Sequence, residues 1–99
     1  MGLPVAIDKE RLAEFCRGNR IARLSLFGSV LRDDFGPESD VDVLVQFERE
    51  AVVTLLDMAR MEDELTALFG RRVDLRTPQE LSRYFRDKVL ADAVVQYVA

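Results

Sequence analysis

Residues 26–47 read LFGSVLRDDFGPESDVDVLVQF, and the rest of the chain is arranged around this stretch. Its second half alternates valine with acidic or apolar residues, a pattern typical of a β-strand. Side chains two residues apart on a strand share a face, so we expect Asp40 and Asp42 to point the same way. Two carboxylates this close repel each other unless a cation lies between them, and Mg²⁺ prefers such oxygen ligands. The spacing therefore predicts a metal site.

The first half of the stretch has the features of a phosphate-binding turn. An apolar strand is expected to end at Gly28-Ser29, where a residue without Cβ lets backbone amides approach an anion and a hydroxyl adds a donor. The next residues predict a helical turn whose N–H groups face the same anion, with Arg32 near enough to pair with a phosphate oxygen. Residues 33–39 are rich in turn formers and lead back to the acidic strand.

A third aspartate lies on a later segment with strand character. Residues 71–76 place two apolar side chains on one face and put Asp74 on the other, among arginines. If this strand lies beside the first acidic strand, Asp74 completes a group of three carboxylates. The alternative is an ion pair between Asp74 and Arg72 or Arg76.

Two helices are predicted from their capping residues. Asp8 has the position of an N-cap for a first helix, and Thr54 with Asp57 has the pattern of a capping box for a second. We expect the second helix to bury one stripe of side chains spaced three and four residues apart. The members of this stripe are Leu55, Met58, Met61, Leu65 and Leu68.

A third helix start follows the Asp74 strand. Thr77-Pro78-Gln79-Glu80 supplies an N-cap, a proline in the first turn and an acidic residue after it, and we expect one continuous helix through Leu90. Residues 93–98 are apolar and β-branched, and an edge strand, a packed tail and a partner-binding segment all remain open for them. Together these elements predict an α/β (α+β) fold with a small mixed three-stranded sheet flanked by helices.

Length and composition indicate one small domain spanning residues 1–99. A chain of 99 residues can build a single core, but its stability is expected to be modest unless a partner covers some of its surface. The formal net charge of −4 argues against nucleic-acid binding and favours a basic partner. The absence of histidine and the single cysteine, Cys16, exclude an internal disulfide, a zinc site and histidine-based catalysis. Because no signal peptide or membrane-length apolar run is visible, we expect a cytoplasmic protein without membrane contact.

Gly28-Ser29, ten intervening residues and then Asp40-Val41-Asp42 resemble the signature of the nucleotidyltransferase superfamily that includes DNA polymerase β and the aminoglycoside adenylyltransferases. More narrowly, FGSVLRDDFGPESDVDVLVQF with the later RRVDLRTPQELSRYFRDKVL is similar to the minimal nucleotidyltransferase antitoxins, which are paired with HEPN-domain ribonuclease toxins. The resemblance covers nearly the whole chain and implies a polymerase β-like nucleotidyltransferase fold.

The resemblance also implies an activity, in which AMP moves from ATP to a tyrosine hydroxyl of a HEPN toxin held in a hetero-oligomer. Two Mg²⁺ ions would assist, and Asp74 would act as the base or as a ligand of the second ion. The implied nucleotide-binding residues are Gly28, Ser29 and Arg32, and the implied catalytic and metal-binding residues are Asp40, Asp42 and Asp74. Because larger superfamily members use further domains to cover the base, we expect a second protein or a second copy to contact the adenine.

Two other functions stay open. The chain would be a non-catalytic antitoxin if an Asp42→Asn variant still neutralised the toxin by binding it. It would be a small-molecule nucleotidyltransferase, with an antibiotic-like alcohol as acceptor, if it were active without any protein partner. The short chain argues against this second alternative.

Overall fold

The computed structural model describes residues 7–31, 36 and 39–99, and within these ranges four strands form one sheet in the order β3-β2-β1-β4. β1 (Ile21–Phe27) pairs antiparallel with β2 (Val41–Phe47) and with β4 (Val94–Val98), whereas β3 (Val73–Arg76) pairs parallel with β2. The mixed sheet and the α/β class are confirmed. The expected count of three strands is wrong, because the C-terminal segment that the sequence left open forms the fourth strand.

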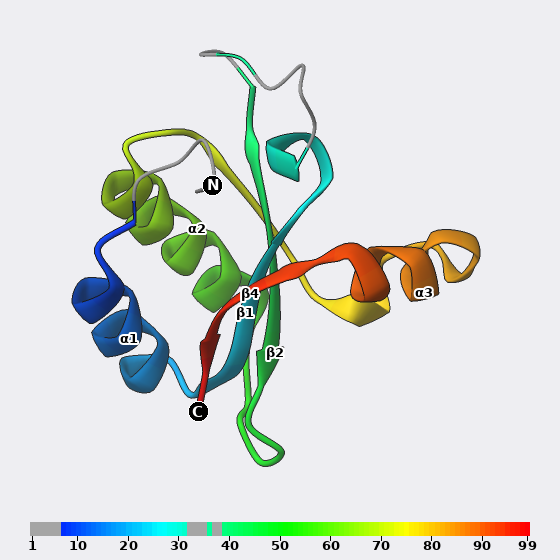
Figure 1. Cartoon of the computed structure of the whole chain (residues 1–99). Helices are drawn as coiled ribbons and strands as arrows, with labels where there is room; N and C mark the ends of the chain where they lie inside the picture. The colour runs from blue at the N-terminus through cyan, green and yellow to red at the C-terminus, as the bar shows by residue number, and fades with distance from the viewer. Residues whose placement is uncertain (1–6, 32–35, 37–38) are drawn as a thin grey trace.

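Helices lie on both sides of this sheet. Figure 1 shows α1 (Lys9–Gly18) and α2 (Leu55–Phe69) together on one side, and α3 (Arg83–Asp92) on the opposite side. Two short 3₁₀ helices complete the description, η1 (Gly28–Leu31) after β1 and η2 (Pro78–Glu80) after β3. Among the described residues, none of the helices combines the length and the apolar character that a membrane span requires.

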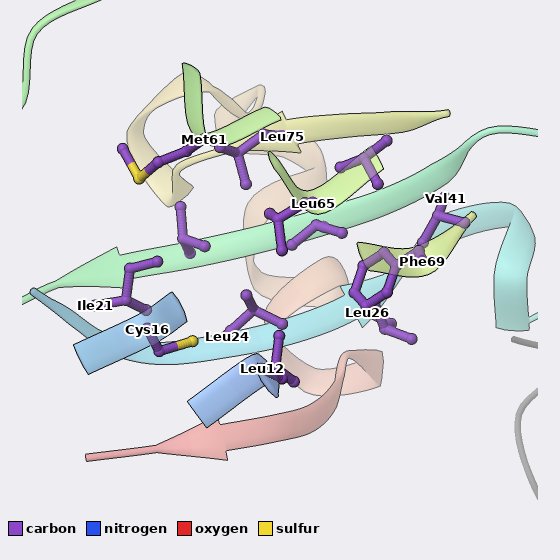
Figure 2. Close-up of a cluster of buried hydrophobic side chains, with 13 residues drawn as sticks. Leu12, Cys16, Ile21, Leu24, Leu26, Val41, Met61, Leu65, Phe69 and Leu75 are labelled. Atoms are coloured by element: carbon purple, nitrogen blue, oxygen red, sulfur yellow. The ribbon is translucent and has the colours of Figure 1, made fainter. Parts of the chain in front are cut away.

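The hydrophobic core fills the space between the sheet and the pair α1 and α2 (Figure 2). Leu24 and Leu26 of β1 lie in register with Val45 and Val43 of β2, so these four side chains share the face that the helices cover. The helices contribute Leu12, Cys16, Met61, Leu65 and Phe69. Polar residues between these strand positions therefore project from the opposite face of the sheet, where the candidate site lies.

α1 and α2 begin at the capping residues that the sequence predicts. Asp8 accepts hydrogen bonds from two backbone N–H groups of the first turn of α1, at 3.1 and 3.2 Å. Thr54 and Asp57 form a reciprocal capping box at 3.1 and 3.0 Å. At the other end of α2, Gly70 takes the left-handed conformation that ends many helices, with φ at +69°.

One member of the predicted α2 stripe is wrong. Leu55 is 89% exposed, whereas Met61 and Leu65 are buried and Met58 packs against the core. At 3.6 residues per turn, Leu55 lies about 80° around the helix axis from Leu65. It also lies in the first turn of the helix, so three- and four-residue spacing alone placed it on the wrong face.

The predicted third helix is divided into two. η2 contains the residues of the predicted helix start, but Leu81 is extended at φ −78° and ψ 143°, and Ser82 caps a separate helix, α3. The side chain of Arg86 donates to the carbonyls of Pro78 at 2.8 Å and Leu81 at 3.1 Å. A continuous helix would use these carbonyls for its own backbone hydrogen bonds, so the Arg86 contacts favour the break.

Candidate functional site

The site begins at Gly28, where β1 ends. Gly28 has φ at +72°, in the left-handed region that only glycine occupies at little cost. A Cβ built at this position would lie 2.2 Å from Oδ2 of Asp42. Both the backbone conformation and the close approach therefore require glycine. The turn at Gly28 and the carboxylate of Asp42 lie in direct contact.

The structure describes only part of the other two predicted phosphate-binding residues, Ser29 and Arg32. The helical turn expected after Gly28 is present as η1, and the backbone of Ser29 belongs to it. The side chain of Ser29 and the whole of Arg32 lie outside the described residues. Their roles in binding phosphate stay predictions.

Asp42 and Asp74 are neighbours in the sheet. The parallel pairing of β2 and β3 sets these two residues in register, and paired residues on adjacent strands project from the same face. On the other side of Asp42, the antiparallel partner from β1 is Phe27. Asp42 is half-buried and has Phe27 and Asp74 as its partners on the two adjacent strands. The sequence predicts that Asp74 joins the other carboxylates if its strand lies beside the strand of Asp42, and the fold has this strand pairing.

Asp40 lies immediately before β2 and is exposed. The backbone N–H of the next residue, Val41, donates to the carbonyl of Arg72 at 2.9 Å, so the pairing with the β3 segment begins directly after Asp40. Asp40 therefore stands at the end of the sheet near Gly28, two residues from Asp42, while Asp42 lies within the strand.

Asp74 also takes the alternative role that the sequence left open. Its Oδ1 lies 3.1 Å from Nε of Arg76, and this hydrogen bond and charge raise the pKa of Arg76 above its usual range. Arg76 in turn lies 3.8 Å from Glu80. Both side chains of the Asp74–Arg76 pair are more than a third exposed, so the pair contributes little stability and opens at little cost.

The donor chemistry fits a hard cation such as Mg²⁺, although the described side chains form no group of three metal-ligating residues as they stand. Asp42 and Asp74 are in register, and the missing Cβ at Gly28 lets Oδ2 of Asp42 lie directly against the turn. Carboxylate oxygens are the ligands that Mg²⁺ uses in proteins. Asp74 would have to turn away from Arg76 to join a shared ion.

An open cavity of about 840 Å³ adjoins the contact between Gly28 and Asp42. Phe27 and Leu31 line it on the sheet side, and one face of α3 lines it on the other. Sequence reasoning missed the contribution of α3 to the site. The signal was available, because Phe85, Val89 and Asp92 recur at helical spacing and share a face.

Residues 9–96 match the family model described as the nucleotidyltransferase domain. The chain is 36% identical over 74 residues to the protein adenylyltransferase MntA of Thermococcus cleftensis, covering 75% of this chain and 73% of the relative. It is 31% identical over 86 residues to a Methanocaldococcus jannaschii protein described as a candidate protein adenylyltransferase, covering 87% and 90% of the two chains.

Solved structures agree with this family match. One described as a candidate minimal nucleotidyltransferase has a TM-score of 0.71 and 37% identity, covering 87% of this chain and 86% of that chain. A toxin–antitoxin complex with AMP-PNP is similar in fold, with a TM-score of 0.73 at 17% identity over 94% and 75% of the two chains. A complex of tri-AMPylated HEPN toxin and MNT antitoxin from Shewanella oneidensis has a TM-score of 0.65 at 17% identity, covering 92% and 70%.

Proposed function

The chain belongs to the nucleotidyltransferase domain family, and from this premise we propose that it transfers AMP from ATP to a hydroxyl of a partner protein. The observation that carries the proposal is the contact between Gly28 and Asp42, where the absence of a Cβ lets a carboxylate oxygen approach the backbone of the turn. A phosphate chain and its counter-ions need such a place, in which backbone without side chains borders a cluster of carboxylates.

We propose further that the partner is a HEPN ribonuclease toxin and that the modified residue is a tyrosine. Two relatives with substantial identity carry the description of protein adenylyltransferase, in one case as a candidate. A protein of the same fold is an MNT antitoxin in complex with a tri-AMPylated HEPN toxin. The chain would accordingly act as an antitoxin that silences its toxin by covalent modification.

The proposed roles follow from the positions of the aspartates. Asp40 and Asp42 would hold two Mg²⁺ ions, which supply positive charge to the triphosphate and lower the pKa of the acceptor hydroxyl when they are bound. The Gly28 turn, with Ser29 and Arg32, would hold the phosphates. Asp74 would take the proton of the acceptor hydroxyl or join Asp42 as a ligand. The acceptor oxygen then bonds to the α-phosphorus, and the bond from that phosphorus to pyrophosphate breaks.

The test is transfer of label from α-³²P-ATP to the toxin, with the purified chain, Mg²⁺ and a catalytically inert toxin as acceptor. We expect Asp42→Asn to abolish labelling and leave the fold intact, because the change also removes repulsion between neighbouring carboxylates. The matched control is Asp63→Asn, the same chemical change at an exposed position on α2. Equal labelling by wild type and Asp42→Asn would refute the proposed site.

The second candidate, a non-catalytic antitoxin, is favoured by the exposed apolar side chains of α3 and β4, among them Leu90, Val95 and Val98. Such a surface suits a protein partner and does not depend on the aspartates. Toxin neutralisation by Asp42→Asn at the wild-type level, with no labelling of the toxin by either protein, would favour this candidate over the enzyme.

A further inference from the structure

α3 is the helix with the least packing in the described part of the chain. It buries none of its residues, and Phe85 remains 64% exposed although it lines the cavity beside the site. α1 and α2, by contrast, each insert two or more fully buried side chains into the core. An exposed apolar surface that lines a cavity is typical of a ligand-binding site.

The cavity has two different ends. Next to the sheet it meets Gly28 and Asp42, where the proposed triphosphate lies. Next to α3 its walls include the aromatic ring of Phe85 and the aliphatic side chain of Val89. Lys88 belongs to the same lining and pairs with Asp92 at 3.3 Å, so charged groups border the apolar wall. A nucleoside triphosphate has the same order, with phosphates at one end and, at the other, a flat base whose faces stack on apolar and aromatic side chains.

We propose that this cavity holds the nucleoside of the triphosphate, with the base against Phe85 and Val89, and that the nucleotide supplies the packing that α3 lacks. The inference rests on the proposed function, since the phosphates must lie at Gly28 and Asp42. The volume of about 840 Å³ falls within the range of about 300–1,000 Å³ that is usual for small-molecule sites. The inference differs from the expectation that a second protein or a second copy contacts the adenine, because it places the base against this chain.

The first experiment compares binding of ATP and of inorganic tripolyphosphate, both with Mg²⁺, by calorimetry. Phe85→Ala is expected to weaken ATP binding about tenfold, because it removes an aromatic surface on which a base stacks, and to leave tripolyphosphate binding unchanged. Tyr84→Ala is the matched control, since Tyr84 is the adjacent aromatic residue, is 86% exposed and does not line the cavity. It should change neither affinity.

The second experiment uses hydrogen exchange and a variant that fills the cavity. ATP should slow backbone exchange in α3 of the wild type, whereas tripolyphosphate should not. Val89→Trp should abolish the slowing by ATP and weaken ATP binding, with tripolyphosphate binding retained as evidence that the variant is folded. The core helices α1 and α2 serve as internal references within the same measurement.

The outcomes separate this inference from the proposed function. If the wild type binds neither ATP nor tripolyphosphate, both are overturned. If it binds both ligands and Phe85→Ala weakens neither, or if ATP leaves exchange in α3 unchanged, the inference alone is overturned. If Phe85→Ala reduces labelling of the toxin without weakening ATP binding, the cavity belongs to the acceptor side chain and the assignment to the nucleoside is wrong.

Discussion

Gly28 and Gly70 have nearly the same left-handed backbone, with φ at +72° and +69°, but different surroundings. Nothing lies within 4 Å of a Cβ built on Gly70, whereas a Cβ on Gly28 would collide with Asp42. Gly70→Ala should therefore cost only the strain of a left-handed alanine, about 1 kcal/mol. Gly28→Ala should cost more and also abolish label transfer, because Asp42 must move.

Urea unfolding of the two variants, together with the toxin-labelling assay, checks this prediction. Gly18→Ala provides a second control, because Gly18 ends α1 without left-handed strain and has no neighbour within 4 Å. We expect Gly18→Ala to be neutral or slightly stabilising. Full activity of Gly28→Ala would contradict the requirement for glycine at the site.

Cys16 is fully buried in the core, and burial raises the pKa of its thiol to about 12. The unfolded chain ionises this thiol near pH 9, so between about pH 9 and pH 12 the unfolded state binds fewer protons than the folded state. The contribution of Cys16 to stability is thus complete below pH 9 and declines as the pH rises through this window. Other groups titrate here too, so the measurement is the difference in free energy of unfolding between wild type and Cys16→Ala.

That difference should shrink from pH 8.5 to pH 10.5. At pH 8, Cys16 in the folded protein should also resist a thiol reagent, and urea should make it reactive at the rate of unfolding. A difference in stability that stays constant with pH would mean that the thiol is not held in its neutral form by the core.

At the scale of the element, the start of α2 depends on the Thr54–Asp57 capping box. Thr54→Ala should destabilise the protein by about 1 kcal/mol at pH 7, as loss of an N-cap does elsewhere. The hydrogen bonds from Thr54 lower the pKa of Asp57, so the contribution of this carboxylate is present at neutral pH and is lost as the pH falls through that lowered value. Asp57→Asn should therefore differ from wild type in urea unfolding at pH 7 and approach it only as the pH falls below the usual pKa of an aspartate.

Thr77→Ala is the matched control, because Thr77 is the N-cap residue of η2, a helix of only three residues, but its hydroxyl donates to the Glu80 carboxylate at 3.1 Å and caps no backbone N–H. It should cost clearly less than Thr54→Ala. Equal losses would mean that the N-cap hydrogen bond does not limit the stability of α2.

The helix starts and the break before α3 differ in how far they depend on local sequence. Asp8 and Thr54 act within one helical turn of themselves, so local pattern located the starts of α1 and α2. The break at Leu81 depends instead on where the side chain of Arg86 reaches, five residues away and outside any capping pattern. Helical spacing alone could not predict it.

At the scale of the whole molecule, the candidate site depends on strand order. Local spacing predicted two carboxylates on one strand, and the fold sets Asp74 in register with Asp42 because β3 pairs with β2. The sequence left the position of β4 open, because apolar β-branched residues suit a strand, a tail or an interface equally well. The cavity between the sheet and α3 needs both β4 and the break before α3, so it could not be predicted from local pattern.

Exposed apolar side chains gather at the start of α2 and at a second place, on α3 and β4. Leu55 and Leu56 lie at the start of α2. Arg60, one turn further along α2, donates to Asn19, which precedes β1. This end of β1 is the one opposite Gly28. Val95 lies on β4 opposite Ser25 and next to Val94, which lines the cavity at Asp42. A toxin that presents an acceptor hydroxyl to Asp42 must approach from this second place.

We therefore expect Val95→Glu to weaken toxin binding and labelling at least tenfold, because it puts a charge into a desolvated contact. Leu56→Glu makes the same change at a more exposed residue, 82% accessible, and should leave both unchanged. ATP binding by the two variants, measured by calorimetry, controls for damage to the nucleotide site. If Leu56→Glu were the variant that lost toxin binding, the toxin would dock at the far end of the sheet, too far away for the Asp42 site to modify a residue in the contact.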